Sequence, residues 1–209
     1  MMKTILCYGD SNTWGYNPRT NKKYNEGIRW SSILENELGK GFKVITEGLN
    51  GRTSVWDDPI EGEFKNGKTY LTSCIHSHKP IDLVIFYLGA NDLKYRFNVT
   101  AYDIAKSIET LVNITRESKT GVGEKSPKIL VIIPTKIGKL DEPEGAFFGA
   151  EGKSQRLSYE FNKVFENSEV ILLDSNEIIK TSSIDGVHLD DESHKILGFE
   201  VTKIVKKIL

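Results

Sequence analysis

Short apolar runs alternate along the chain with longer segments in which apolar residues recur at helical spacing. Each run consists mostly of β-prone residues and stops at glycine, proline or polar side chains, as expected for strands buried on both faces of a parallel sheet. The runs lie at residues 3–9, 42–48, 81–88, 128–134 and 170–174. The run at 81–88 is the most apolar, so we expect it at the centre of the sheet.

The segments between these runs carry an apolar stripe on one side, which predicts helices that cover the sheet. Helices are expected at residues 28–38, 70–78, 101–118 and 154–165, with a last helix capped by Asp190. Residues 17–27 and 136–152 are expected to be loops. Strands that alternate with helices through short links predict a right-handed parallel sheet. The expected fold is therefore α/β, a three-layer α/β/α sandwich with a five-stranded parallel sheet, in one domain over residues 1–209.

Charge and composition exclude several classes of partner. The formal net charge is −1, which offers no broad basic field for nucleic acid or an anionic membrane. No run approaches the roughly 20 apolar residues of a membrane span, and the apolar run near the start is needed as a strand, so no signal peptide is expected. Cys7 and Cys74 have no disulfide-like spacing, which favours reduced thiols and a cytoplasmic location.

His76 and His78 form the pattern most suggestive of a metal site. Two residues apart at a helix end, they point in different directions, and no acidic or Cys partner is expected nearby. A solvated helix terminus is the favoured interpretation. We expect no metal and no cofactor.

Polar residues follow the first strand directly. Gly9 ends the run, and Asp10, Ser11, Asn12 and Thr13 come next. Ligands of open α/β sheets bind at the carboxyl edge of the strands, so Ser11 is a candidate nucleophile. The alternative is that these residues only cap a helix.

Three further polar groups belong to the same edge. Asn50-Gly51 follows the second strand, Asn91 follows the third, and Asp185 lies three residues before His188 on a late loop. Separately, each has an ordinary explanation as a tight turn, a cap or a surface residue. Together they match an acyl-transfer site, in which a serine needs a histidine base held by a carboxylate.

An acyl-transfer site also needs donors for the oxyanion that forms on the acyl carbonyl. The backbone N–H groups of Ser11 and Gly51 and the side-chain amide of Asn91 are the candidates. Gly51 suits this role because a side chain there would obstruct close approach of the backbone.

With these residues the sequence resembles the SGNH (GDSL-type) hydrolases. Gly9-Asp10-Ser11, Asn50-Gly51, the run 89–92 and Asp185 with His188 are similar to the four sequence blocks of that family, in the same order over nearly the whole chain. The resemblance implies a flavodoxin-like sheet with strand order 2-1-3-4-5 and a metal-independent serine esterase. It also implies Ser11 as nucleophile, Gly51 and Asn91 as oxyanion donors, His188 as base and Asp185 as its partner.

The longer runs 9–15 and 47–53, with 57–59, resemble the arylesterase and acyltransferase branch of the family. Members of that branch act on short acyl esters, some form oligomers, and some pass the acyl group to alcohols or peroxide. Ala90 stands where many members have Thr or Gln, and Gly51 where some have Ala. The resemblance thus implies a small-molecule ester as substrate and allows a homo-oligomer, with carbohydrate acetyl ester, thioester and lysophospholipid cleavage as alternatives.

Six residues are candidates for contacts with substrate: Asp10, Asn12, Trp14, Trp56, Phe147 and Phe148. Bulky aromatic walls would favour short acyl groups, but the same rings could simply pack loops against the core.

Two other classes of function share the fold: a flavodoxin-like nucleotide or flavin binder, and an idle scaffold for self-association. No G-x-G-x-x-G or P-loop motif occurs, and neither class needs Asp185 and His188.

Overall fold

A five-stranded parallel sheet forms the centre of the molecule in a computed structural model that describes residues 2–142 and 144–209. Its order is β4-β1-β5-β6-β7, with every neighbouring pair parallel. The strands are β1 (Lys3–Gly9), β4 (Phe42–Gly48), β5 (Leu83–Tyr87), β6 (Lys128–Ile133) and β7 (Ile171–Asp174). All five predicted strands are present, and the α/β class is confirmed.

The strand labels of the main sheet do not read 2-1-3-4-5, the predicted order, because the numbering also counts two short strands outside this sheet. β2 (Tyr16–Asn17) and β3 (Lys22–Lys23) pair as an antiparallel hairpin in a segment that was expected to be a loop. Asn21 allows the turn between them, because asparagine tolerates its positive φ of 55°. Counted without this hairpin, the strands of the main sheet follow one another as 2-1-3-4-5.

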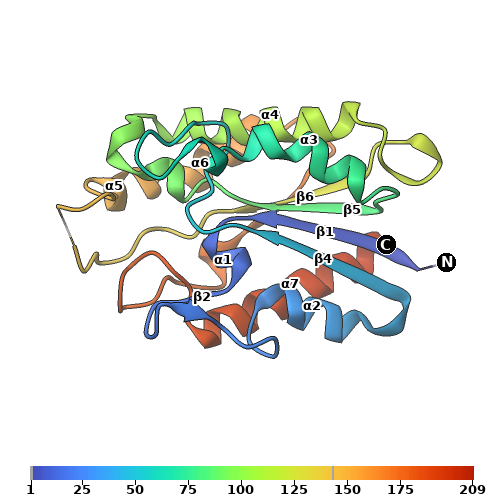
Figure 1. The fold of residues 1–209 in the computed structure, drawn as a ribbon, viewed down its shortest axis with the longest axis horizontal. Helices are drawn as coiled ribbons and strands as arrows, with labels where there is room; N and C mark the ends of the chain where they lie inside the picture. Colours follow the sequence, from blue (N-terminus) through green and yellow to red (C-terminus); the bar gives the residue numbers. More distant parts are fainter. Residues whose placement is uncertain (1, 143) are drawn as a thin grey trace.

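Helices cover both faces of the sheet (Figure 1). One face carries α2 (Trp30–Leu38) and α7 (Asp191–Ile208), and the other carries α3 (Gly67–Ser77), α4 (Ala101–Glu117) and α6 (Leu157–Phe165). Alternate residues of β1 serve the two layers: Leu6 and Tyr8 belong to the core under α3, α4 and α6, while Ile5 and Cys7 pack toward α2 and α7. A strand buried on both faces needs such a continuous apolar run.

The short elements lie mostly in the connections. They are α1 (Ser11–Trp14), α5 (Ala150–Ser154), and the 3-10 turns η1 (Gly39–Gly41), η2 (Glu63–Lys65), η3 (Asn91–Leu93), η4 (Tyr95–Phe97), η5 (Val122–Glu124) and η6 (Ser175–Glu177). Among the described residues, no helix is both long and apolar enough to cross a membrane.

The helix predicted at 154–165 is wrong at its start. α5 ends at Ser154 and α6 begins at Leu157. The buried Ser154 hydroxyl donates to the carbonyl of Glu151 and accepts the backbone N–H of Ile137, so it holds the preceding loop instead of opening a helix. The predicted cap of the last helix is confirmed, because Asp190 Oδ1 accepts the N–H of Ser193 at 2.8 Å.

Register brings the ends of the first three strands of the main sheet level with each other. Gly9 of β1 is paired with Gly48 of β4 on one side and with Tyr87 of β5 on the other. A β-carbon on Gly48 would run into the backbone of Trp14, so glycine here lets α1 pack against β4. The segments that follow Gly9, Gly48 and Tyr87 therefore leave the sheet side by side.

Candidate active site

Ser11 begins the short helix α1 directly after the end of β1. Asp10 caps this helix: its Oδ1 accepts the N–H of Asn12 at 2.9 Å. The Ser11 side chain is nearly buried, with the residue 6% exposed. Asp10 therefore provides the cap, and the Ser11 hydroxyl is left free to face another group.

That group is His188. Its Nε2 lies 2.9 Å from Ser11 Oγ, and its Nδ1 lies 2.6 Å from Asp185 Oδ2. With Asp185 accepting a proton-bearing Nδ1, Nε2 is the acceptor for the Ser11 hydroxyl. The sequence separation of Ser11 and His188 is 177 residues, and the fold brings the predicted trio into one hydrogen-bond chain.

Asp185 is bound on both of its oxygens. Oδ1 accepts the backbone N–H groups of Val187 and His188 at 2.9 and 3.0 Å, while Oδ2 faces the imidazole. Burial alone would raise the pKa of Asp185, but the bonds and charge of His188 outweigh it, and the pKa is lowered. Asp185 is therefore an ionised carboxylate that orients the ring of His188.

Asn12 and Asp10 were expected to bind substrate, and the structure engages both inside the protein. Asn12 Oδ1 accepts the N–H of Leu189 at 2.9 Å, which ties the Ser11 turn to the loop that carries His188. Asp10 is 2% exposed, and its burial raises its pKa to about 6. Asp10 Oδ1 and Asn12 Oδ1 are thus used in positioning the turn, and direct contact of either residue with substrate stays a prediction.

Tyr16 is a site residue that the sequence analysis missed. Its ring stacks on the imidazole of His188, with centroids 4.2 Å apart and planes at 36°. Its hydroxyl donates to Asn21 Oδ1 at 2.9 Å across the β2–β3 hairpin. The only signal in the sequence was an aromatic residue just after the Ser11 turn. The sequence did not reveal the hairpin that orients its ring.

The candidate oxyanion donors come from the loops on either side of β1. Gly51 follows β4 with φ +78°, a conformation that favours glycine, and a β-carbon there would collide with Glu61 Oε2. Asn91 opens η3 after β5 and is 6% exposed. Among the residues described, no protein group accepts a hydrogen bond from the Asn91 side-chain amide, so this amide is free to donate to a ligand.

Arg52 fastens the Gly51 turn to the end of β1. Its Nη1 donates to the carbonyl of Gly9 at 2.9 Å and to that of Glu47, and its guanidinium lies 4.3 Å from the ring centroid of Tyr8. The residue is 4% exposed. A buried arginine thus joins the two strand ends that lead to Ser11 and Gly51.

The four aromatic candidates for pocket walls occupy different environments. Trp56 and Phe147 are partly buried against the core, Trp14 has Lys23 Nζ 5.1 Å from its ring, and Phe148 is 52% exposed beside Tyr95. Among the described interactions, none joins these rings to Ser11 or His188. Trp56 and Phe147 pack on the core, and contact of the four rings with substrate stays a prediction.

One expectation about histidine is wrong. His78 has an acidic partner, because its Nε2 lies 3.0 Å from Oε1 of Glu47, and Cys74 Sγ lies within 4.8 Å of both ligand atoms. The sequence did not show this because Glu47 comes from β4 and the other two from α3. Carboxylate, imidazole and thiol are metal donors. However, burial raises the pKa of Cys74 to about 12, and Glu47 and His78 already satisfy each other.

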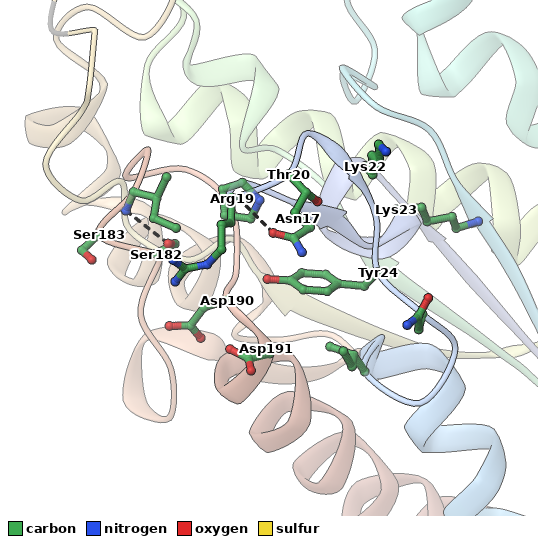
Figure 2. Close-up of a pocket in the computed structure, with 14 residues that line it drawn as sticks. Asn17, Arg19, Thr20, Lys22, Lys23, Tyr24, Ser182, Ser183, Asp190 and Asp191 are labelled. Atoms are coloured by element: carbon green, nitrogen blue, oxygen red, sulfur yellow. Dashed lines mark hydrogen bonds between the residues drawn. The ribbon is translucent and has the colours of Figure 1, made fainter.

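A polar pocket of about 580 Å³ lies between the β2–β3 hairpin and the loop that carries Asp185 and His188 (Figure 2). The hairpin side includes Asn17, Arg19 and Lys22, and the loop side includes Ser182 and Asp190. Neither Ser11 nor His188 lines it. It is therefore separate from the Ser11–His188 contact.

Comparisons with known proteins show the family of the chain. The sequence model of the GDSL-like lipase/acylhydrolase family matches residues 7–196. No curated protein matches significantly.

Two solved structures are similar over nearly their whole length. An aryl esterase from M. smegmatis is 36% identical, with TM-score 0.93 over 99% of this chain and 100% of that one. A carbohydrate acetylesterase from Sinorhizobium meliloti is also 36% identical, with TM-score 0.94 over the same shares. These likenesses favour an enzyme over a flavin binder or an idle scaffold. The chain belongs to the GDSL-like lipase/acylhydrolase family and is a carboxylic-ester hydrolase.

Proposed function

We propose that the protein cleaves short-chain carboxylic esters through an acyl-enzyme on Ser11. The observation that carries this proposal is the hydrogen-bond chain from Ser11 through His188 to Asp185. Ser11 Oγ attacks the ester carbonyl carbon while His188 Nε2 takes the hydroxyl proton. The same nitrogen returns that proton to the leaving alcohol, which departs as the ester C–O bond breaks.

Water completes the cycle in a second attack. His188 takes a proton from the water molecule, the resulting hydroxide adds to the acyl carbon, and Ser11 Oγ leaves with the proton restored by His188. Asp185 stays ionised throughout and stabilises the imidazolium that forms in each half of the cycle. An alcohol in place of water would give acyl transfer, which the same residues support.

The oxyanion of each tetrahedral intermediate would be received by three donors: the backbone N–H groups of Ser11 and Gly51 and the side-chain amide of Asn91. Support comes from the two flanking loops, which leave the sheet level with the end of β1, and from the unpaired Asn91 amide. Donors of this kind act most strongly when fixed in place before the reaction.

For the substrate we propose short acyl esters of aryl alcohols or of carbohydrates. The similar solved structures, an aryl esterase and a carbohydrate acetylesterase, support this choice. Trp14 and Phe148 are proposed to line the entrance. Rates with p-nitrophenyl acetate, butyrate and octanoate test the chain length: we expect acetate to be the best substrate, and a preference for octanoate would contradict it.

An exposed apolar patch supports a homo-oligomer. Ile60 and Phe64 are 74% and 66% exposed, and Tyr95 and Phe148 pack edge to face while both remain exposed. The two groups are neighbours because Asp58, near Ile60, pairs with Arg96. Such patches mark protein contacts. Light scattering on Ile60→Glu is expected to show a smaller mass than the wild-type protein, and an unchanged mass would reject this patch.

We also propose a cytoplasmic location, which the two buried free thiols, Cys7 and Cys74, support. Fractionation of cells that produce the protein tests it, and recovery outside the cytoplasm would contradict it.

Labelling with a fluorophosphonate tests the proposed nucleophile directly. The reagent forms a covalent bond to an activated serine oxygen with loss of fluoride. Mass spectrometry is expected to find the label on Ser11 and to find labelling strongly slowed in His188→Ala. Ser175, another buried serine that follows a strand, provides the internal control. Label on other serines in place of Ser11 would reject the proposal.

A further inference from the structure

The two donors proposed beside Ser11 lie on separate loops, so something must fix their relative position. Gly51 belongs to the loop after β4, and Asn91 belongs to the turn after β5. Both loops leave the sheet next to β1, but β4 and β5 are not neighbours in the sheet. Sheet hydrogen bonds therefore do not connect these two loops to each other.

Asp92 makes a buried connection between them. It follows Asn91 directly, and Oδ1 and Oδ2 each lie 3.1 Å from the backbone nitrogen of Ser54, three residues after Gly51. The Ser54 hydroxyl donates to Asp92 Oδ1 as well. Both residues are completely buried. The carboxylate of Asp92 thus binds the loop after β4 through both the main chain and the side chain of Ser54.

The connection continues into the helical layer. Ser54 Oγ lies 2.6 Å from Ser107 Oγ on α4, and Ser107 Oγ lies 2.7 Å from the carbonyl of Ile104. Burial raises the pKa of Asp92 to about 6, although the bonds from Ser54 and the charge of Lys94 oppose the rise. Burying a carboxylate is costly unless its hydrogen bonds are made, and Ser54 supplies them.

A second connection nearby is more exposed. Lys94 pairs with Glu61, and Glu61 lies against Gly51. The Glu61 side chain keeps 34% exposure, whereas Asp92 and Ser54 keep none. Asp92 is also adjacent to Asn91 in the chain, so a shift of its carboxylate moves the donor directly.

We propose that Asp92 is a positioning residue of the oxyanion site: by binding Ser54 it holds the Gly51 and Asn91 donors at the separation that a single oxyanion requires. This inference rests on the proposed function. Its physical basis is that preorganised donors must be placed within about 0.5 Å, and that a misplacement of about 1 Å costs roughly 100-fold in rate.

Asp92→Asn tests this because it keeps the shape of the side chain and places an NH₂ group where an oxygen now accepts from Ser54. We expect kcat for p-nitrophenyl acetate to fall about 10- to 100-fold, with KM changed less than threefold. A trifluoromethyl ketone, to which Ser11 Oγ adds while His188 takes the proton, carries the same oxyanion. Its Kd is expected to weaken by the same factor as kcat/KM.

Asp82→Asn is the matched control. Asp82 Oδ2 likewise accepts a backbone N–H, that of Thr4 at 2.8 Å, but just before β5 at the opposite edge of the sheet. The control is expected to lose stability in urea unfolding and to keep kcat and the ketone Kd within twofold of wild type. A similar loss of kcat in both variants would mean that Asp92 matters only for general stability, and the proposal would be overturned.

A double-mutant cycle with Asn91→Ala separates positioning from an independent effect. If Asp92 acts through the donors, the loss of kcat in the double variant is expected to be smaller than the product of the two single losses, because the Asn91 amide is already gone and only the Gly51 donor remains to be misplaced. Losses that multiply, or wild-type kinetics for Asp92→Asn, would overturn the proposal. If Asp92→Asn does not fold, Ser54→Ala replaces it: a three- to tenfold loss of kcat with a matching loss of ketone affinity supports the role, and wild-type values reject it.

Ser11→Ala in the same assay keeps the two claims apart. If Ser11→Ala is inactive and Asp92→Asn is unimpaired, positioning by Asp92 is rejected and the proposed function stands. If Ser11→Ala is as active as wild type, the proposed function itself is rejected.

Discussion

The hydroxyl of Ser11 lies in a chain of hydrogen bonds that has a direction. Asp185 accepts from Nδ1 of His188, which leaves Nε2 as the acceptor for the Ser11 proton at 2.9 Å. A serine hydroxyl alone is a weak nucleophile, and we propose that His188 is the base that activates it. The lowered pKa of Asp185 keeps the carboxylate ionised at neutral pH.

Asn91→Ala removes the side-chain amide that we propose as an oxyanion donor. Loss of one such donor is expected to lower kcat by roughly 10²–10³-fold while KM changes little. Steady-state kinetics with p-nitrophenyl acetate measure both values. A twofold change in kcat would leave Asn91 as an ordinary turn residue.

Tyr16→Ala removes the ring that stacks on His188. An aromatic contact of this kind is worth about 0.5–1.5 kcal/mol, so kcat is expected to fall roughly two- to tenfold as the imidazole loses its support. Tyr16→Phe keeps the ring, loses only the bond to Asn21, and is the control, expected within twofold of wild type. Equal losses in both variants would assign the effect to the hairpin and not to the stacked ring.

At this scale the sequence predicted the chemistry but not the contacts. Ser11, Asp185 and His188 could be predicted to lie together because their residue types follow strand ends or lie on a late loop. The sequence did not show that one side-chain oxygen each of Asp10 and Asn12 accepts a backbone N–H, because a polar residue at a strand edge does not reveal which backbone groups lie near it. Tyr16 and Asp92 contact residues of other segments, His188 and Ser54, and no local sequence pattern predicts such contacts.

The loops at the strand ends are held by buried acids. Asp10 caps α1, Asp92 binds the loop after β4, and Asp58 accepts the guanidinium of Arg96 at 2.7 Å as well as the N–H groups of Ile60 and Glu61. Because a buried carboxylate needs several directed bonds, each of these acids fixes a segment of backbone. The three carboxylates thus hold in place the segments that follow the strand ends, including those that carry the site residues.

Asp58→Asn is expected to lower the free energy of unfolding by about 3 kcal/mol at pH 7, because it leaves Arg96 and Lys94 without one of their carboxylates. Burial would raise the pKa of Asp58, but the opposite effect of Arg96 and of the two backbone donors is larger. The pKa is therefore lowered from 3.8 to about 2. A lowered pKa gives stability that is present above pH 4 and is lost as the pH falls toward 2.

The difference in unfolding free energy between the wild-type protein and Asp58→Asn is therefore expected to shrink from pH 4 to pH 2. Urea unfolding at several pH values measures it. A difference that stays constant over this range would show that Asp58 does not contribute through its charge.

At the level of elements, the long regular segments were predictable and the short ones were not. Period and apolarity marked all five strands of the main sheet, because burial on both faces demands uninterrupted apolar residues. The hairpin of β2 and β3 has two residues in each strand, too few for any period. The helix expected at 154–165 begins only at Leu157, because the Ser154 hydroxyl binds the loop before it, a contact that helical spacing does not predict.

The whole molecule joins two apolar layers across one sheet, and residues far apart in sequence meet at its carboxyl edge. Both core clusters include residues of β1, β5 and β6, so neither layer has a sheet of its own. We propose on this basis that residues 1–209 are a single domain. Urea unfolding followed by tryptophan fluorescence and by circular dichroism is expected to give one coincident transition, and two separated transitions would reject it.

The central claim is that the fold brings Ser11 and His188 together in order to cleave esters. Turnover of p-nitrophenyl acetate by purified Ser11→Ala tests it most directly, with circular dichroism to show that the variant is folded. We predict a loss of kcat/KM well beyond 100-fold. A folded Ser11→Ala protein with kcat/KM close to wild type would contradict the account.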